Sequence, residues 1–91
     1  MPDLAFLGSG GLDAEAGLTD YYPDEIVSRR VVLRNASRAY VMADSSKHGR
    51  VAPFKVSDLD AFTGVITDTI STAMHDALQR AGLDVLTAST D

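Results

Sequence analysis

The sequence predicts an α/β protein built on an open, mostly parallel sheet with flanking helices. Short apolar runs typical of strands alternate along the chain with segments typical of helices. Some of the apolar runs are followed by glycine or by acidic and hydroxyl side chains, at the strand ends where open α/β sheets bind ligands. The chain has 91 residues, which allows at most one domain with a modest core.

The first half of the chain contains one predicted strand, one loop and one helix. Leu4–Leu7 is an apolar run that stops at Gly8, and we expect a buried strand there. The polar, glycine-rich segment 8–23 is expected to be a long loop. Pro23 fits the first turn of a helix, where its missing N–H has no intrahelical partner, and the helix is expected to reach about Ser37.

The second half is expected to contribute three more strands and one more helix. The strands are expected at 39–43, 64–68 and 84–88, with a short extended segment at 50–56 and a turn or single helical turn at 57–62. The helix is expected over Thr69–Ala81, capped by Asp68 or Thr69 at its start and by Gly82 at its end. Apolar residues recur on one helical face of this segment: Ile70, Ala73, Met74, Ala77, Leu78 and Ala81.

Composition excludes several functional classes. The formal net charge is −5, which argues against direct binding of DNA or RNA. Cysteine is absent, so neither a disulfide framework nor a thiolate metal site is expected. No apolar run approaches the roughly 20 residues of a membrane span, and the N-terminus lacks the basic region of a signal peptide. We expect a cytoplasmic chain without membrane association.

The best candidate for a binding site is the segment 44–49, Asp-Ser-Ser-Lys-His-Gly, directly after a predicted strand. Lys47 supplies a point charge for a phosphate or carboxylate. Ser46, its neighbouring hydroxyl and the loop N–H groups are suited to complete an anion site, with Asp44 beside them. An exposed Asx or Ser turn explains the same residues equally well.

The glycines at 8, 10 and 11 form a second, weaker candidate. Glycine lets backbone N–H groups approach an anion. However, Gly8, Gly10 and Gly11 have neither the G-x-G-x-x-G spacing nor the Walker pattern, so a simple tight turn is the favoured interpretation. His48 and His75 lack a metal-ligand spacing, and the sequence has no nucleophile elbow. We therefore expect no metal and no cofactor.

Several motifs together resemble one family, the DeoR-type bacterial transcriptional regulators. The segment DLAFLGSGGLDAEAGLT resembles the family's D-x-A-F-hydrophobic-G … G-hydrophobic … G-L-T pattern. The segment DEIVSRRVVLRNASRAYVMADSSKHGR resembles the following E-x-x-x-K-R … hydrophobic-A-D-x-S-K-x-G pattern, and VITD falls where the family has its next strand and acid. The resemblance runs from about Asp3 to the final strand.

The resemblance implies an effector-sensing domain for phosphorylated sugars, similar in fold to ribose-5-phosphate isomerase. By position, Gly8 matches the first segment, Gly17 and Thr19 match the G-L-T turn, Arg29 falls at the basic position of the helix, and Asp44, Ser46 and Lys47 match the D-x-S-K-x-G loop. Gly10 and Gly11, which follow Gly8, are added to this set. These residues are the expected ligand-binding set. Arg29 stands where the family usually has Lys, which keeps the charge but changes its geometry.

Two departures from the family limit what the resemblance implies. The isomerases have an acid where this chain has Leu7, and an aliphatic side chain cannot accept a proton, so an enzyme is disfavoured. The family's upstream helix-turn-helix and its phosphate-cradling strand and loop are not recognisable either. We therefore expect residues 1–91 to form a single, partial sensing domain without a DNA-binding domain. It is expected to associate as a homodimer or with another regulator chain, and an interaction protein without ligand is the alternative.

Overall fold

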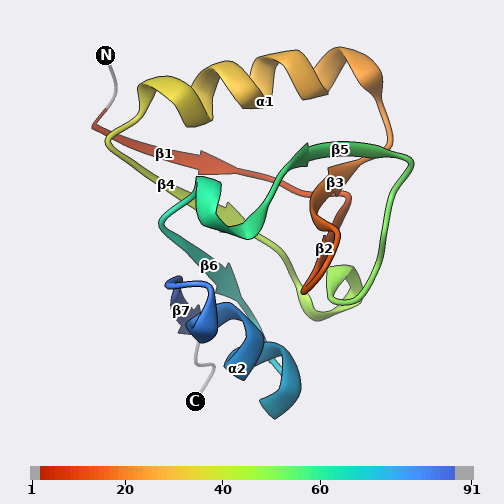
Figure 1. Ribbon diagram of the computed structural model, residues 1–91, viewed down its shortest axis with the longest axis vertical. Coiled ribbons are helices and arrows are strands. Elements are labelled where there is room, and N and C mark those ends of the chain that lie inside the picture. Colours follow the sequence, from red (N-terminus) through yellow and green to blue (C-terminus); the bar gives the residue numbers. More distant parts are fainter. Residues whose placement is uncertain (1–2, 88–91) are drawn as a thin grey trace.

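The computed structural model describes residues 3–87, which form two sheets and two α-helices (Figure 1). Sheet A is parallel throughout, and its strands in spatial order are β1 (Leu4–Leu7), β4 (Arg38–Met42), β6 (Gly64–Thr67) and β7 (Asp84–Thr87). Sheet B is antiparallel and consists of β2 (Gly11–Asp13), β3 (Gly17–Asp20) and β5 (Phe54–Ser57). The predicted α/β class with a mostly parallel sheet is confirmed. The last residue of the expected final strand, Ala88, lies outside the described residues.

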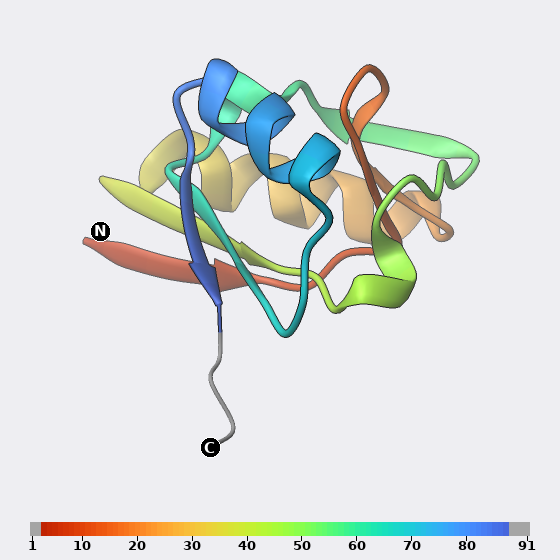
Figure 2. The ribbon, with the colours of Figure 1, turned by 90° about the horizontal axis from the view of Figure 1, so that it is seen from below.

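The two helices lie on the same side of sheet A. Helix α1 (Pro23–Asn35) precedes β4, and helix α2 (Thr72–Arg80) connects β6 to β7. The strand order β1-β4-β6-β7 advances in one direction, and right-handed crossovers then place every connection on one face. Figure 2 shows both helices on that side. We call the side that faces the helices the inner face of sheet A and the opposite side its outer face.

The hydrophobic core lies between the inner face, the helices and sheet B. Side chains from all of these elements meet there, and the largest that are fully buried are Leu12, Leu18, Val41, Val65 and Leu78. Two of them belong to β2 and β3, so the small sheet is an integral part of the core. Neither helix within residues 3–87 has the length and apolar composition needed to cross a membrane.

The expected long loop at 8–23 is wrong, because most of it forms the β2–β3 hairpin. Asp13 accepts hydrogen bonds from the amides of Glu15 and Ala16, at 3.0 and 2.9 Å, which closes the turn. Gly17 then adopts a φ of 79°, which glycine tolerates best. Leu12 and Leu18 anchor the two strands in the core. Three- and four-residue strands are too short to show a clear period of two in the sequence.

The expected helix bounds are wrong by one to three residues at three of the four ends. Helix α1 ends at Asn35 because Ala36 is extended, with ψ 140°, and leads into β4. Helix α2 begins at Thr72, and its cap is Ser71, whose hydroxyl accepts a 3.1 Å hydrogen bond from the amide of Met74. It ends at Arg80, and Gly82 follows with a φ of 85°, as expected for a helix end.

Strand β1 is an edge strand, and the expectation that it is buried is only half correct. Leu7 faces inward and is buried, whereas Leu4 and Phe6 point to the outer face with exposed fractions of 39% and 55%. The alternation arises because successive side chains of a strand point to opposite faces. In helix α2, Ala73 was expected on the buried apolar face but is exposed.

Candidate functional site

The carboxyl ends of β1, β4 and β6 converge at one edge of sheet A (Figure 1). Gly8 and Ser9 follow β1, the segment 43–47 follows β4, and Asp68 and Thr69 follow β6. The hydroxyl of Ser9 donates a 3.3 Å hydrogen bond to the carbonyl of Met42, so the first two segments touch. Parallel strands end together, and this edge is where open α/β sheets bind ligands.

Asp44 organises the segment that follows β4. Its carboxylate accepts a 2.9 Å hydrogen bond from the amide of Ser46 and a second one from the Ser46 hydroxyl. These bonds cap the short 3₁₀ helix Ser45–Lys47. The Ser46 hydroxyl, and after it the Ser46 amide, holds the pKa of the Asp44 carboxyl below its usual range. Asp44 is also exposed, so the sheet edge presents its carboxylate to solvent.

Asp68 connects the ends of β4 and β6. Its carboxylate accepts hydrogen bonds from the amide of Thr69 at 2.7 Å and from the amide of Ser45 at 2.8 Å. These bonds, that from Thr69 foremost, lower the pKa of the Asp68 carboxyl. Asp68 thus holds the Asp44 segment beside the β6 end.

His48 and Thr67 contact each other beside the segment that follows β4. The His48 Nε2 lies 3.2 Å from the Ala43 carbonyl and 3.1 Å from the Thr67 hydroxyl. A carbonyl can only accept, so the Ala43 contact requires the proton to be on Nε2. The amide of Gly49 donates a 2.8 Å bond to the carbonyl of Leu12, which ties the segment to the β2–β3 hairpin.

Arg29 lies near the end of β1 and joins three elements. Its Nη1 donates a 2.6 Å hydrogen bond to the Gly8 carbonyl, and its Nη2 donates a 2.8 Å bond to Glu25 of the same helix. Its Nε lies 2.7 Å from Oδ2 of Asp20 in β3. The N–H direction at this last contact does not meet hydrogen-bond geometry, so it is an ion pair without a hydrogen bond. One guanidinium therefore faces two carboxylates.

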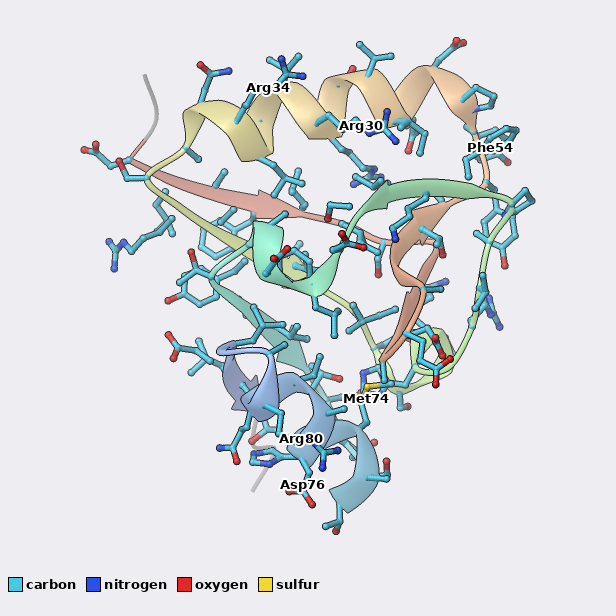
Figure 3. All side chains as sticks on the ribbon, in the orientation of Figure 1. Arg30, Arg34, Phe54, Met74, Asp76 and Arg80 are labelled. Carbon is cyan, nitrogen blue, oxygen red and sulfur yellow. The ribbon has the colours of Figure 1, made fainter. Side chains whose placement is uncertain are left out.

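Arg30, the next residue, points away from this edge. Figure 3 shows it projecting from α1, where it donates to the carbonyls of Lys55 and Val56 in β5, at 2.7 and 3.0 Å. Of the two arginines, only Arg29 reaches the end of β1. Adjacent helical positions face different ways, which accounts for the division.

The expected ligand residues in and beside the hairpin contact other parts of the protein. A Cβ on Gly11 would lie 2.2 Å from the Arg50 carbonyl oxygen, and one on Gly10 would lie 3.0 Å from the Asp20 Cα. The Thr19 hydroxyl is buried and accepts a 2.8 Å bond from the amide of Ala52. Together with Gly17 in the turn, Gly11 and Thr19 allow the hairpin to pack closely.

Two shallow grooves lie along the candidate edge. One, of about 320 Å³, is lined by Leu7 and by residues of α1 that include Glu25 and Arg29, whose charges offset each other. The other, of about 380 Å³, lies between the Asp44 segment and the start of α2 and is lined by Ser45, His48, Thr69, Ile70 and Ser71. The second offers hydroxyls and the amino-terminal end of a helix, which favours anions. Within residues 3–87, no cluster of side chains suited to a metal ion occurs.

Of the expected ligand residues, the structure brings Gly8, Arg29, Asp44, Ser46 and Lys47 to the sheet edge and places Gly11, Gly17 and Thr19 in the hairpin. Gly10 lies between the two, just before β2. The sequence-based set omitted several residues of the same edge: Ser9, Ser45, His48, Thr67, Asp68 and Thr69. Asp68 was visible as an acid at the end of a predicted strand. Combining the carboxyl ends of all the parallel strands would have included it.

Residues 1–69 match the family described as "DeoR C terminal sensor domain". The chain belongs to this family, which confirms the resemblance seen in the sequence.

Three relatives illustrate the match. The chain is 39% identical over 76 residues to the HTH-type transcriptional regulator FruR of Bacillus subtilis, covering 84% of this chain and 28% of that protein. It is 33% identical over 85 residues to the HTH-type transcriptional regulator GlpR of Haloferax volcanii, covering 92% of this chain and 33% of that protein. It is 30% identical over 67 residues to the deoxyribose operon repressor of Escherichia coli, covering 74% of this chain and 27% of that protein.

The chain thus spans about a third or less of the length of these relatives. It is a sensor domain of the DeoR type, related to transcriptional regulators. Because the family is one of sensor domains and these relatives are regulators, the expectation that the domain is not an enzyme is supported.

Proposed function

We propose that this domain binds a phosphorylated sugar at the carboxyl edge of sheet A and passes the signal to a transcriptional regulator. The observation that carries the proposal is the convergence of three strand ends, which places Gly8, Asp44 and Asp68 at one edge. Two relatives from Escherichia coli are named for a sugar and for a phosphorylated polyol, as a deoxyribose operon repressor and a glycerol-3-phosphate regulon repressor. Their names support an effector that combines hydroxyl groups with a phosphate.

The edge offers separate groups for the two parts of such a ligand. Lys47 supplies a point charge for the phosphate, and among residues 3–87 it makes no ion pair within 4.0 Å. The backbone N–H groups at the start of α2 add hydrogen-bond donors. The hydroxyls of Ser45 and Ser46 already donate to Asp68 and Asp44, and their oxygens can accept hydrogen bonds from the sugar. The carboxylates of Asp44 and Asp68 accept hydrogen bonds from sugar hydroxyls.

The remaining residues of the expected set act around the ligand. Gly8 and Gly10 flank Ser9 directly after the carboxyl end of β1. Arg29 acts indirectly, because two carboxylates already offset its charge and its Nη1 is bonded to Gly8. The other three, Gly11, Gly17 and Thr19, shape the hairpin that supports the Asp44 segment.

The domain's role in regulation is to sense rather than to bind DNA. Its net charge of −5 is unfavourable for contact with phosphate backbones. DNA binding would be the task of a helix-turn-helix, of the kind that gives two of the relatives their names. Residues 1–91 then act as a single cytoplasmic sensing domain that associates with a second copy or with another regulator chain. Effector binding and operator binding share a coupling free energy.

Calorimetric titration with sugar phosphates tests the proposal. Lys47→Ala should weaken binding by about 1.5–3 kcal/mol, the contribution of a hydrogen bond to a charged group. Lys55→Ala is the matched control, since Lys55 lies on β5 and pairs with Asp58 at 2.5 Å. Equal affinities of the wild type and Lys47→Ala would remove Lys47 from the site.

A further inference from the structure

The outer face of sheet A is uncovered by any segment within residues 3–87. Both helices and sheet B lie on the inner side, as the one-directional strand order requires (Figure 2). Parallel sheets are otherwise covered on both faces, because their strands are apolar on both.

Apolar side chains cross this face from one edge to the other. The register aligns Phe6 with Tyr40, and Met42 with Ile66 and Leu86. The exposed fractions of Phe6, Met42 and Leu86 are 55%, 50% and 49%. A contiguous apolar patch of this kind marks an interaction surface.

The face is flat rather than hollow. Gly64 stands in the row of Phe6 and Tyr40, and a Cβ on it would lie only 3.0 Å from the ring carbon Cε1 of Tyr40. The Tyr40 ring therefore fills the space above Gly64. The rings of Phe6 and Tyr40 lie 6.3 Å apart and 30° from coplanar. A level surface fits another sheet better than a single inserted side chain.

The charges of the face are balanced, unlike those of the whole chain. The net charge of the chain is −5. The outer-facing positions of β1, β4, β6 and β7 carry only Arg38 and Asp84, on different strands. Two such faces can meet without net repulsion, and each offers the other a cation and an anion.

We propose that two copies of this chain pack through the outer faces of their sheets. Side chains of the two faces would interdigitate across the roughly 10 Å that separate stacked sheets. The contact is isologous, with the same patch on both copies. The inference does not depend on the proposed effector, which lies at the carboxyl edge.

The size of the face sets the strength of the contact. Four strands of four or five residues span a flat area of about 250 Å². The projecting side chains expose more than this, but less than the roughly 800 Å² per partner of a standard interface. The dimer is therefore weak and depends on concentration.

Amide NMR spectra and sedimentation velocity of the full chain from about 10 μM to about 1 mM test the proposal, because an interface of this size forms in that range. We expect the mass to rise towards that of a dimer and the amide shifts to change on the four strands of sheet A. Phe6→Glu should raise the dissociation constant at least about tenfold. Val27→Glu, at an apolar position on α1 that is also exposed, is the control and should leave it unchanged.

A second variant separates stacking of faces from pairing of the exposed β1 edges. Leu86→Glu lies on β7, at the far side of the face, and weakens only the stacked dimer. Thermal melting of each variant verifies that it is folded. A chain that stays monomeric throughout, shift changes located on α1, or a Leu86→Glu variant that dimerises normally would each overturn the proposal.

Discussion

The guanidinium of Arg29 lies between Gly8 and Asp20, which follow or end strands of two different sheets. It donates a 2.6 Å hydrogen bond to the Gly8 carbonyl at the end of β1, and its Nε lies 2.7 Å from the carboxylate of Asp20 at the end of β3. Sheet A and sheet B are thus joined at the edge where the effector is proposed to bind. Arg29 is a positioning residue in this account.

Removing the Arg29 charge should destabilise the fold. Arg29→Met would leave Asp20, whose side chain is only 7% exposed, without its cation. The expected loss is about 2–3 kcal/mol in the free energy of unfolding, less than for a fully buried pair because Arg29 is 19% exposed. Denaturant unfolding measures it, with the exposed Arg34→Met as the control. Equal losses in the two variants would contradict the structural role of Arg29.

The hairpin's close approach to the segment after residue 49 gives a second prediction. Gly11→Ala would place a Cβ 2.2 Å from the Arg50 carbonyl oxygen, a backbone clash that no rotamer relieves. The expected loss is about 3 kcal/mol. Gly49→Ala meets no atom within 4 Å but has a φ of 75°, which costs about 1–2 kcal/mol. If Gly49→Ala were the more damaging change in chemical unfolding, the docking of the hairpin would be wrongly described.

The pH dependence of the sheet edge follows from Asp44 and Asp68. Hydrogen bonds from Ser46, and from Thr69 and Ser45, lower the pKa values of these two carboxyls in the folded protein. The unfolded value is about 3.9. The stabilisation is therefore fully present above about pH 4 and is lost as the pH falls through the lower folded-state values.

NMR titration of the carboxyl carbons measures both pKa values. The amide signals of Ser45, Ser46 and Thr69 should move with the same midpoints, since these amides donate to the two carboxylates. Asp68→Asn serves as the control and should remove one of the midpoints. A pKa at or above the unfolded value for either carboxyl would show that its hydrogen bonds do not form in solution.

The start of α2 offers a prediction that separates two candidate caps. Ser71→Ala removes the acceptor for the Met74 amide and should cost about 1 kcal/mol. Thr69→Ala changes a residue before the helix and should cost less than about 0.5 kcal/mol. Thermal unfolding of the two variants decides between them. A larger effect at Thr69 would restore the helix start expected from the sequence.

The parts of the fold with strong periodicity were predictable from the sequence. The apolar strands before Gly8, Asp44 and Asp68, and the helix with Met74 and Leu78 on its buried side, were all identified, with bounds that differ from the expected ones by at most three residues. The β2–β3 hairpin was missed because its short strands alternate over too few residues. The start of α2 was misplaced because Asp68, a good capping residue, instead holds the amide of Ser45, and a single sequence does not show such a long-range bond.

The candidate site was predictable where it follows one segment of the chain. Lys47 and its neighbours stood out because acid, hydroxyl and cation follow a strand directly. The role of Arg29 was not predictable, since its partners Gly8 and Asp20 come from other elements. Whether the Arg29 guanidinium contacts a ligand or other residues of the protein depends on tertiary contacts. These contacts follow from the packing of α1 against both sheets.

The measurement that tests the central claim most directly is an amide NMR titration of the chain with a panel of sugar phosphates. The account predicts shift changes confined to the carboxyl edge of sheet A, at 8–10, 44–49 and 68–72, for at least one sugar phosphate. Lys47→Ala should reduce these changes and Lys55→Ala should not. A well-dispersed spectrum that no sugar phosphate alters, or changes located elsewhere in the domain, would contradict it.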